Sequence, residues 1–166
     1  CIRDSVMIGP PADPKDDARV LKLFFAKEGS HICCGGSTAH MISRYLNKPI
    51  IPVEDSGTDK VPAIATIEGM DLVTEGIITL QQVADLAEQY VSDNRLSITI
   101  NSGNDGVSLL CAYLFEQATD INFFFGKAEN TANDDLDIGM DAKAIVINRL
   151  ISSLREMGKN VKISRC

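Results

Sequence analysis

Short apolar segments alternate with amphipathic helical segments along almost the whole chain, and this alternation constrains the fold more than any other feature. The apolar segments are four or five residues long and are bounded by Gly, Pro or polar residues, as buried strands are. The segments between them carry apolar residues at helical spacing. Strands that alternate with helices form a mostly parallel sheet with helices on both faces. The sequence therefore predicts one three-layer α/β domain, Rossmann-like in architecture, over residues 1–166.

The expected elements follow from these periodicities. We expect strands at residues 5–8, 31–34, 50–53, 63–67, 121–125 and 161–164, and a strand edge or hairpin arm at 96–100. In the helix after residue 38, we expect Ile42, Tyr45 and Leu46 to face the core. A fourth helix is expected from Val107 to Phe115.

Local signals mark several helix ends. Asp13-Pro14 opens the first helix, because Asp accepts from free N–H groups and Pro fits the first helical position. Thr79 and Gln82 predict a capping box for the third. A final helix is expected from a cap at Asp141 through Met157, ended by Gly158 in the left-handed conformation.

Composition excludes several classes of function. The net charge of −7 opposes binding to nucleic acid phosphates, which attract clustered Lys and Arg. No segment approaches the roughly 18 apolar residues of a membrane helix, and no secretory signal is visible. The five cysteines are odd in number and lack Cys-x-x-Cys spacing, so they predict inert thiols rather than a disulfide framework. We expect a cytoplasmic protein without nucleic acid or membrane contacts.

The loop Gly35-Gly36-Ser37-Thr38 is the strongest candidate for a binding site. It follows an expected strand and opens a helix, and in parallel sheets ligands bind at such loops. Two glycines let a ligand approach the backbone, two hydroxyls are present, and the helix dipole favours negative charge. We expect an anion there, contacted by the N–H groups of residues 36 to 39. The alternative is a tight turn in which Ser37 or Thr38 only caps the helix.

Further loops are expected at the same edge of the sheet. The first is Gly9-Pro10-Pro11, whose backbone can present groups to a ligand, although a turn capped by Asp13 explains it equally. Another covers residues 71–76, where a carboxylate can hold a ribose, a metal or a proton, or only form a solvated turn. The predicted ligand-binding residues are Gly9, Pro10, Gly35, Gly36, Ser37, Thr38, Thr74, Glu75, Gly76 and Lys127.

No metal site or catalytic residue is predicted in this chain. His31, Cys33, Cys34 and His40 are zinc-ligand types, but strand alternation sends the two cysteines to opposite faces and zinc spacings are absent. The acidic segment 133–141 lacks the glycine and glutamate positions of a calcium loop. No nucleophile and base occur in a known pattern.

The residues of these loops resemble a known family. Gly9-Pro10-Pro11-x-Asp13, then residues 34–39 and 67–76, are similar to the segment after the catalytic domain in bacterial serine phosphatases of the stage II sporulation protein E type (SpoIIE-like). The resemblance is specific to about residue 80 and general beyond it. It implies an attached phosphatase domain, preceding Cys1, in which paired aspartates hold two Mn or Mg ions. The chain is thus expected to be an excised domain of a longer phosphatase polypeptide, without a cofactor of its own.

Three functional hypotheses follow. The first is an accessory, regulatory domain that binds a small anionic ligand, a phosphate-bearing metabolite or nucleotide, and adjusts the phosphatase in signalling. In it Gly35–Thr38 hold the anion, with Thr74 and Glu75 facing it. The second is a stand-alone enzyme acting on a phosphorylated small molecule, with Glu75 or Asp71 as general base. The third is a docking or homodimerisation module that uses the last helix, whose apolar residues are more simply explained as core.

Overall fold

The computed structural model describes residues 2–57, 63–92, 105–126 and 136–165, without the side chains of 136–141. The described strands are β1 (Arg3–Ile8), β2 (Ser30–Cys34), β3 (Ile51–Pro52), β4 (Ala65–Thr66), β5 (Leu72–Thr74), β6 (Asp120–Phe125) and β7 (Asn160–Arg165). The described helices are the 3-10 turn η1 (Pro14–Asp16), α1 (Asp17–Ala26), α2 (Gly36–Leu46), α3 (Ile77–Ser92), α5 (Gly106–Cys111), the π-helical η2 (Ala112–Gln117) and α6 (Leu136–Glu156).

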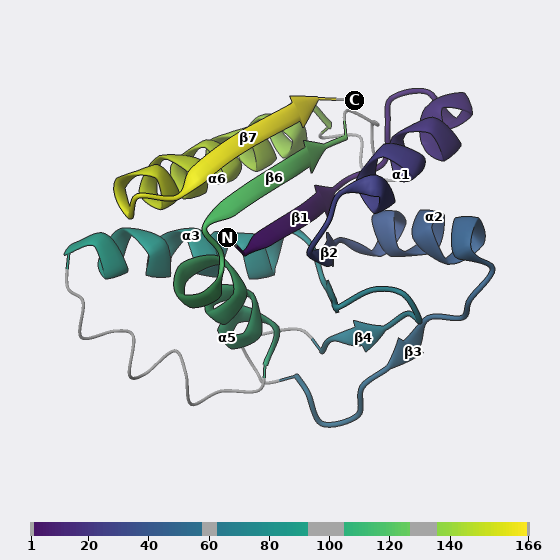
Figure 1. Cartoon of the computed structure of the whole chain (residues 1–166), viewed down its shortest axis with the longest axis horizontal. Coiled ribbons are helices and arrows are strands. Elements are labelled where there is room, and N and C mark those ends of the chain that lie inside the picture. The colour runs from purple at the N-terminus through teal and green to yellow at the C-terminus, as the bar shows by residue number, and fades with distance from the viewer. Residues whose placement is uncertain (1, 58–62, 93–104, 127–135, 166) are drawn as a thin grey trace.

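The described strands form one sheet in the order β3-β4-β5-β2-β1-β6-β7. From β5 to β7 all neighbours are parallel, whereas β3 and β4 add a short antiparallel edge. Counted along the chain, the five parallel strands stand in the order 3-2-1-4-5, which is that of a doubly wound Rossmann sheet. Helices lie on both faces (Figure 1). The predicted fold class is confirmed.

Two apolar cores lie on the two faces of the sheet. One joins Val6, Ile8 and Cys34 to α3, α5 and α6. The other joins Met7 and Cys33 to α1 and α2. Adjacent cysteines therefore face opposite layers, as strand alternation predicts. Cys33, Cys34 and Cys111 are all buried free thiols, in agreement with the expected inert cysteines.

The layer formed by α1 and α2 is narrower than the sheet. Phe124 of β6 belongs to its core, but no described residue of β7 does. Nearer the start of β6, Asp120 and Asn122 are only half-buried, and Asn160 and Lys162 of β7 are exposed. Parallel sheets are normally covered on both faces, so this corner of the sheet departs from the pattern.

Several expected boundaries are wrong. Residues 72–74 were expected within a loop, yet they form β5 and pair with β2. α3 begins at Ile77, and the N–H of Leu80 donates to the carbonyl of Gly76, so Thr79 lies inside the helix and does not cap it. α6 begins at Leu136 instead of after Asp141. The strand expected at residues 63–67 is reduced to the two residues of β4, and that at 50–53 to β3.

Other local signals are confirmed. The side chain of Asp13 accepts a hydrogen bond from the N–H of Lys15 at the start of η1. Gly158 ends α6 with a φ of +87°. Tyr45 is an exception, because 43% of its surface is exposed and its ring stacks on Phe25 instead of entering the core. The strand expected at residues 96–100 lies outside the described residues.

The apolar residues of α6 mostly pack inside the domain. Their buried members are Val146, Ile147, Leu150, Ile151 and Leu154. Ile145 is 60% exposed. The interpretation of this helix as core is confirmed for those five, and homodimerisation stays a prediction.

Candidate functional site

The carboxyl ends of β1, β2, β5 and β6 lie side by side, because the four strands are parallel neighbours. Gly9, Gly35, Glu75 and Gly126 follow these strands directly. We call this edge the rim, defined as residues 9–11, 35–38, 74–76 and 126. It holds every predicted ligand-binding residue except Lys127, which lies outside the described residues.

The first turn of α2 is the most open part of the rim. Its N-cap residue, Gly35, has a φ of +120° and supplies no side-chain cap. The N–H groups of Gly36, Ser37 and Thr38 have no acceptor within the helix, since these are first-turn positions. Gly36 and Ser37 are exposed, and a Cβ added to Gly36 would meet nothing within 4 Å. These amides stand at the positive end of the helix dipole.

One expected contact of the anion is wrong. The N–H of Ala39 donates to the carbonyl of Gly35 at 3.0 Å, as the first hydrogen bond of the helix. Residue 39 therefore has no amide to offer a ligand. The available amides are those of residues 36 to 38.

Thr38 is held inside the structure. Its side chain is 1% exposed, and its hydroxyl oxygen accepts a hydrogen bond of 2.8 Å from the N–H of Gly9. This bond joins the loop after β1 to the first turn of α2. Thr38 thus positions the two loops relative to each other, a structural role that sequence reasoning missed.

The backbones of the β1 and β6 loops touch. The N–H of Gly126 donates to the carbonyl of Ile8 at 2.8 Å. A Cβ on Gly126 would lie 2.1 Å from the carbonyl oxygen of Pro10. This distance is too short for any residue other than glycine. The strand order reverses between β1 and β6, because β2 and β5 are added on one side of β1 and β6 and β7 on the other. At such a point doubly wound sheets open a binding crevice. Here the backbones of Gly9, Pro10 and Gly126 close that point.

The end of β5 is also bound to its neighbour. The N–H of Gly35 donates to the carbonyl of Thr74 at 2.9 Å. The Thr74 hydroxyl is buried and lies 2.9 Å from the carbonyl oxygen of Glu75. A Cβ on Gly76 would come within 3.4 Å of the Gly35 Cα. The expectation that Thr74 faces an anion is therefore not met, because its hydroxyl is bonded to the main chain.

Asp71 and Glu75 lie at opposite ends of β5 because one precedes this strand and the other follows it. Asp71 accepts a 2.7 Å hydrogen bond from the N–H of His31 at the start of β2. Asp71 is thus remote from the Gly35 loop, and its expected role as a base there is wrong. The misplaced strand boundary caused this error.

Glu75 remains at the rim. Its Oε2 atom is shielded from solvent and has no hydrogen-bond partner among the described residues. Burial raises the pKa of the nearby Cys34 thiol to about 12; the Thr74 hydrogen bond opposes this rise and the Glu75 charge adds to it.

Metal-ligand residue types do not gather in the part of the chain that the structure describes. No group of three His, Cys, Asp or Glu side chains is placed there to hold a metal ion. His31 packs against the ring of Phe24, and its Nε2 lies 3.1 Å from the Phe24 carbonyl oxygen. No described helix has both the length and the apolar character needed to cross a bilayer.

Comparison of the chain with family models, with curated proteins and with solved structures found no significant match.

Proposed function

We propose that this chain is an accessory domain that binds a small anionic ligand, a phosphate-bearing metabolite or nucleotide, at the first turn of α2. One observation carries the proposal: α2 begins without a side-chain cap, and its first two residues, Gly36 and Ser37, are exposed. Free first-turn amides and the helix dipole together attract negative charge. An anion in this position completes the cap that the sequence omits.

The surrounding residues support binding by giving the turn a fixed shape. Gly35 is hydrogen-bonded to Thr74, and Thr38 is hydrogen-bonded to Gly9. These two contacts fix the start of α2 relative to the sheet. Within this arrangement, the Ser37 hydroxyl and two or three amides contact the anion. Among the described residues of the rim, no hydrogen bond joins a nucleophilic side chain to a side-chain base, which supports binding over catalysis.

The resemblance of the loops supports a place for this domain in a larger protein. We propose that it adjusts an attached serine phosphatase of the stage II sporulation protein E type in the cytoplasm. Mn or Mg would belong to that phosphatase domain alone. The test of this part is phosphatase activity of the longer polypeptide with and without the anion that binds here. If a saturating concentration of the anion leaves the phosphatase activity unchanged, the proposed regulatory role is contradicted.

Thermal unfolding of the domain tests the binding itself. Inorganic phosphate, pyrophosphate and AMP are suitable probes, and a probe at 100 times its Kd should add about 2.7 kcal/mol to the free energy of unfolding. Ser37→Ala should weaken that probe roughly tenfold, if the hydroxyl donates to its charge. The absence of a Tm shift with all three probes would contradict the proposal.

A further inference from the structure

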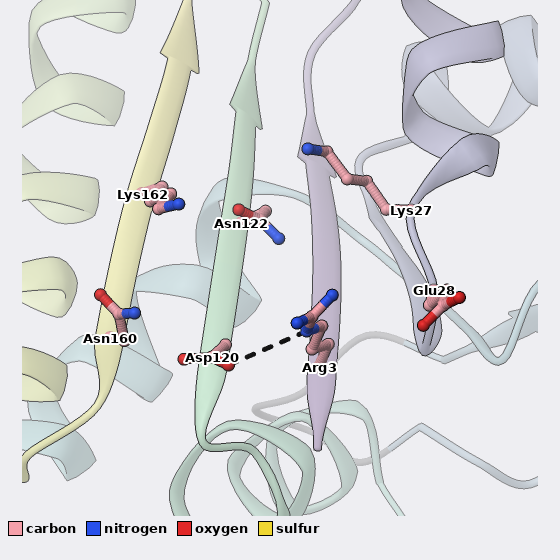
Figure 2. Close-up of a pocket in the computed structure, with 7 residues that line it drawn as sticks. All are labelled: Arg3, Lys27, Glu28, Asp120, Asn122, Asn160 and Lys162. Carbon is pink, nitrogen blue, oxygen red and sulfur yellow. Dashed lines mark ion pairs between the residues drawn. The ribbon is translucent and has the colours of Figure 1, made fainter. Parts of the chain in front are cut away.

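A polar pocket of about 220 Å³ lies on the face of the sheet that α1 and α2 leave uncovered. It is lined by Arg3, Lys27, Glu28, Asp120, Asn122, Asn160 and Lys162 (Figure 2). Most of these residues stand near the beginnings of β1, β6 and β7, so the pocket is remote from the rim at the strand ends. Sequence reasoning did not predict it.

The pocket lies beside two rows of neighbouring residues across the three strands, and most members of these rows line it. Arg3, Asp120 and Asn160 form the first row. Ser5, Asn122 and Lys162 form the second. Side chains in register on parallel strands point to the same face. Each row is polar throughout, although central parallel strands are usually apolar on both faces.

The next row shows where the apolar layer ends. Met7 pairs with Phe124, and both are buried. The ring of Phe24 in α1 packs edge-on against Phe124, with centroids 5.4 Å apart. The turn after α1 then carries Lys27 and Glu28 to the side of the polar rows (Figure 2). The pocket is therefore bounded by the end of α1 on one side and by β7 on the other.

Ser5 belongs to the second row but does not line the pocket itself. Its side chain is fully buried, and its hydroxyl has no hydrogen-bond partner among the described residues. It is the direct neighbour of Asn122, which lines the pocket. Buried hydroxyls normally have a partner, so Ser5 is an exception beside the pocket.

The charges around the pocket favour an anion. Three cations and two carboxylates line it, in a chain whose net charge is −7. Arg3 pairs with Asp120 at 3.9 Å. Lys27 and Lys162 form no ion pair with any carboxylate in the described ranges, and Figure 2 shows Lys162 directed toward Asn122 and Lys27 reaching over β1. Two unpaired ammonium groups thus converge on one polar space.

We propose that this pocket binds a small hydroxylated anion, of the class of sugar acids and sugar phosphates. The anionic group lies between Lys27 and Lys162 above Asn122. Hydroxyl groups of the ligand bond to Asn160, Asp120 and the Arg3 guanidinium. All the described residues that line the pocket are polar, so a purely aliphatic anion gains little by burial against them, whereas each ligand hydroxyl finds a donor or acceptor.

The test uses the 166-residue chain and the side-chain amide signals of Asn122 and Asn160 in NMR spectra. Four probes separate the contribution of the anionic group from that of the hydroxyl groups. They are gluconate, glucose 6-phosphate, neutral glucose, and hexanoate as a carboxylate without hydroxyls. We expect saturable shifts with gluconate or glucose 6-phosphate at millimolar concentrations, and weaker binding of glucose and hexanoate. Which anion binds more tightly distinguishes a carboxylate site from a phosphate site.

Lysine variants locate the bound group. Lys162→Gln and Lys27→Gln should each weaken the better anion roughly tenfold. Lys22→Gln removes the same charge from an exposed position of α1 outside the pocket and should leave affinity unchanged. The proposal is overturned if neither anion shifts the two signals, if glucose or hexanoate binds as tightly, or if the three variants behave alike. Shifts at Gly36 and Ser37 report on the rim, so failure at one site is distinguishable from failure at the other.

Discussion

The N–H of Gly9 donates a 2.8 Å hydrogen bond to the hydroxyl oxygen of Thr38, and this bond ties the loop after β1 to the first turn of α2. Thr38 is buried and Gly9 is half-buried, so the bond is partly shielded from water. A residue that looks from the sequence like a ligand contact is therefore part of the support that holds the amides of Gly36 and Ser37 in place.

Removal of the Thr38 hydroxyl should release the Gly9 amide. Thr38→Val keeps the side-chain volume but leaves a partly buried N–H without an acceptor, at a cost of about 1–3 kcal/mol in the free energy of unfolding. Hydrogen exchange of the Gly9 amide is the direct readout. We expect faster exchange in Thr38→Val than in Thr38→Ser, which retains the hydroxyl. Equal protection of Gly9 in both variants would show that the bond is unimportant.

Two glycines of the rim should respond oppositely to alanine. In Gly126→Ala the new Cβ would overlap the carbonyl oxygens of Pro10 and Gly9, so we expect a loss of at least about 3 kcal/mol. In Gly36→Ala the Cβ meets open space, and the variant should be unchanged or up to about 1 kcal/mol more stable. Urea unfolding of both variants measures the two changes in stability. Similar stability of the two would contradict the backbone closure between β1 and β6.

Much of the fold follows from periodicity, but short elements do not. β1, β2 and β6 are apolar runs bounded by turn residues, and the sequence predicts them well. β5 has only three residues between Asp71 and Glu75, so its local signal is that of a polar loop, and its strand character depends on pairing with β2. That error also placed Asp71 at the wrong edge of the sheet.

The candidate site also has a part that the sequence predicts and parts that it does not. The strand–turn–helix pattern is sufficient to predict the opening of α2 at Gly35 and Gly36. The role of Thr38 depends on the loop after β1, 29 residues earlier in the chain, and no local rule relates the two. The polar pocket depends on strand order, since only the adjacency of β1, β6 and β7 brings Arg3 and Lys162 together. Polar alternation in β6 and β7 was the available signal.

Asp4 should make the domain less stable as pH rises. Its carboxyl is fully buried without a hydrogen-bond partner among the described residues. Burial, together with the charge of Asp71 and against that of Lys159, raises its pKa from 3.8 to about 7. Between these values the folded state binds a proton that the unfolded state releases, so stability falls as pH rises through this window. A pKa difference of roughly three between the folded and unfolded states corresponds to a change of at most about 4 kcal/mol in the free energy of unfolding.

Asp4→Asn tests this by removing the ionisation. We expect the variant to gain stability relative to the native chain between about pH 4 and pH 7, the interval set by the two pKa values. Urea unfolding of both proteins at the two ends of the interval measures the difference. A difference that stays constant with pH would show that Asp4 does not titrate in this range.

The described thiols should be inert in the folded protein. Burial raises the pKa of Cys34 to about 12 and also raises those of Cys33 and Cys111, so little thiolate forms at neutral pH. In a chain with Cys1→Ser and Cys166→Ser, a disulfide reagent should react slowly until denaturant is added, and then rapidly with all three. Rapid reaction of the native variant would mean that one of these thiols is accessible.

Charge at position 36 tests the central claim most directly. Gly36→Asp places a carboxylate where the anion is proposed to sit, and Gly36→Asn adds the same bulk without charge. The helix dipole should make the Asp variant equal to or about 0.3–1 kcal/mol more stable than the Asn variant. We predict saturable shifts of the residue 36 and Ser37 amides with pyrophosphate, inorganic phosphate or AMP in the native and Asn proteins, and affinity at least roughly tenfold lower in the Asp protein. Unresponsive amides in the native chain, or equal affinity of the Asp and Asn variants, would contradict anion binding at α2.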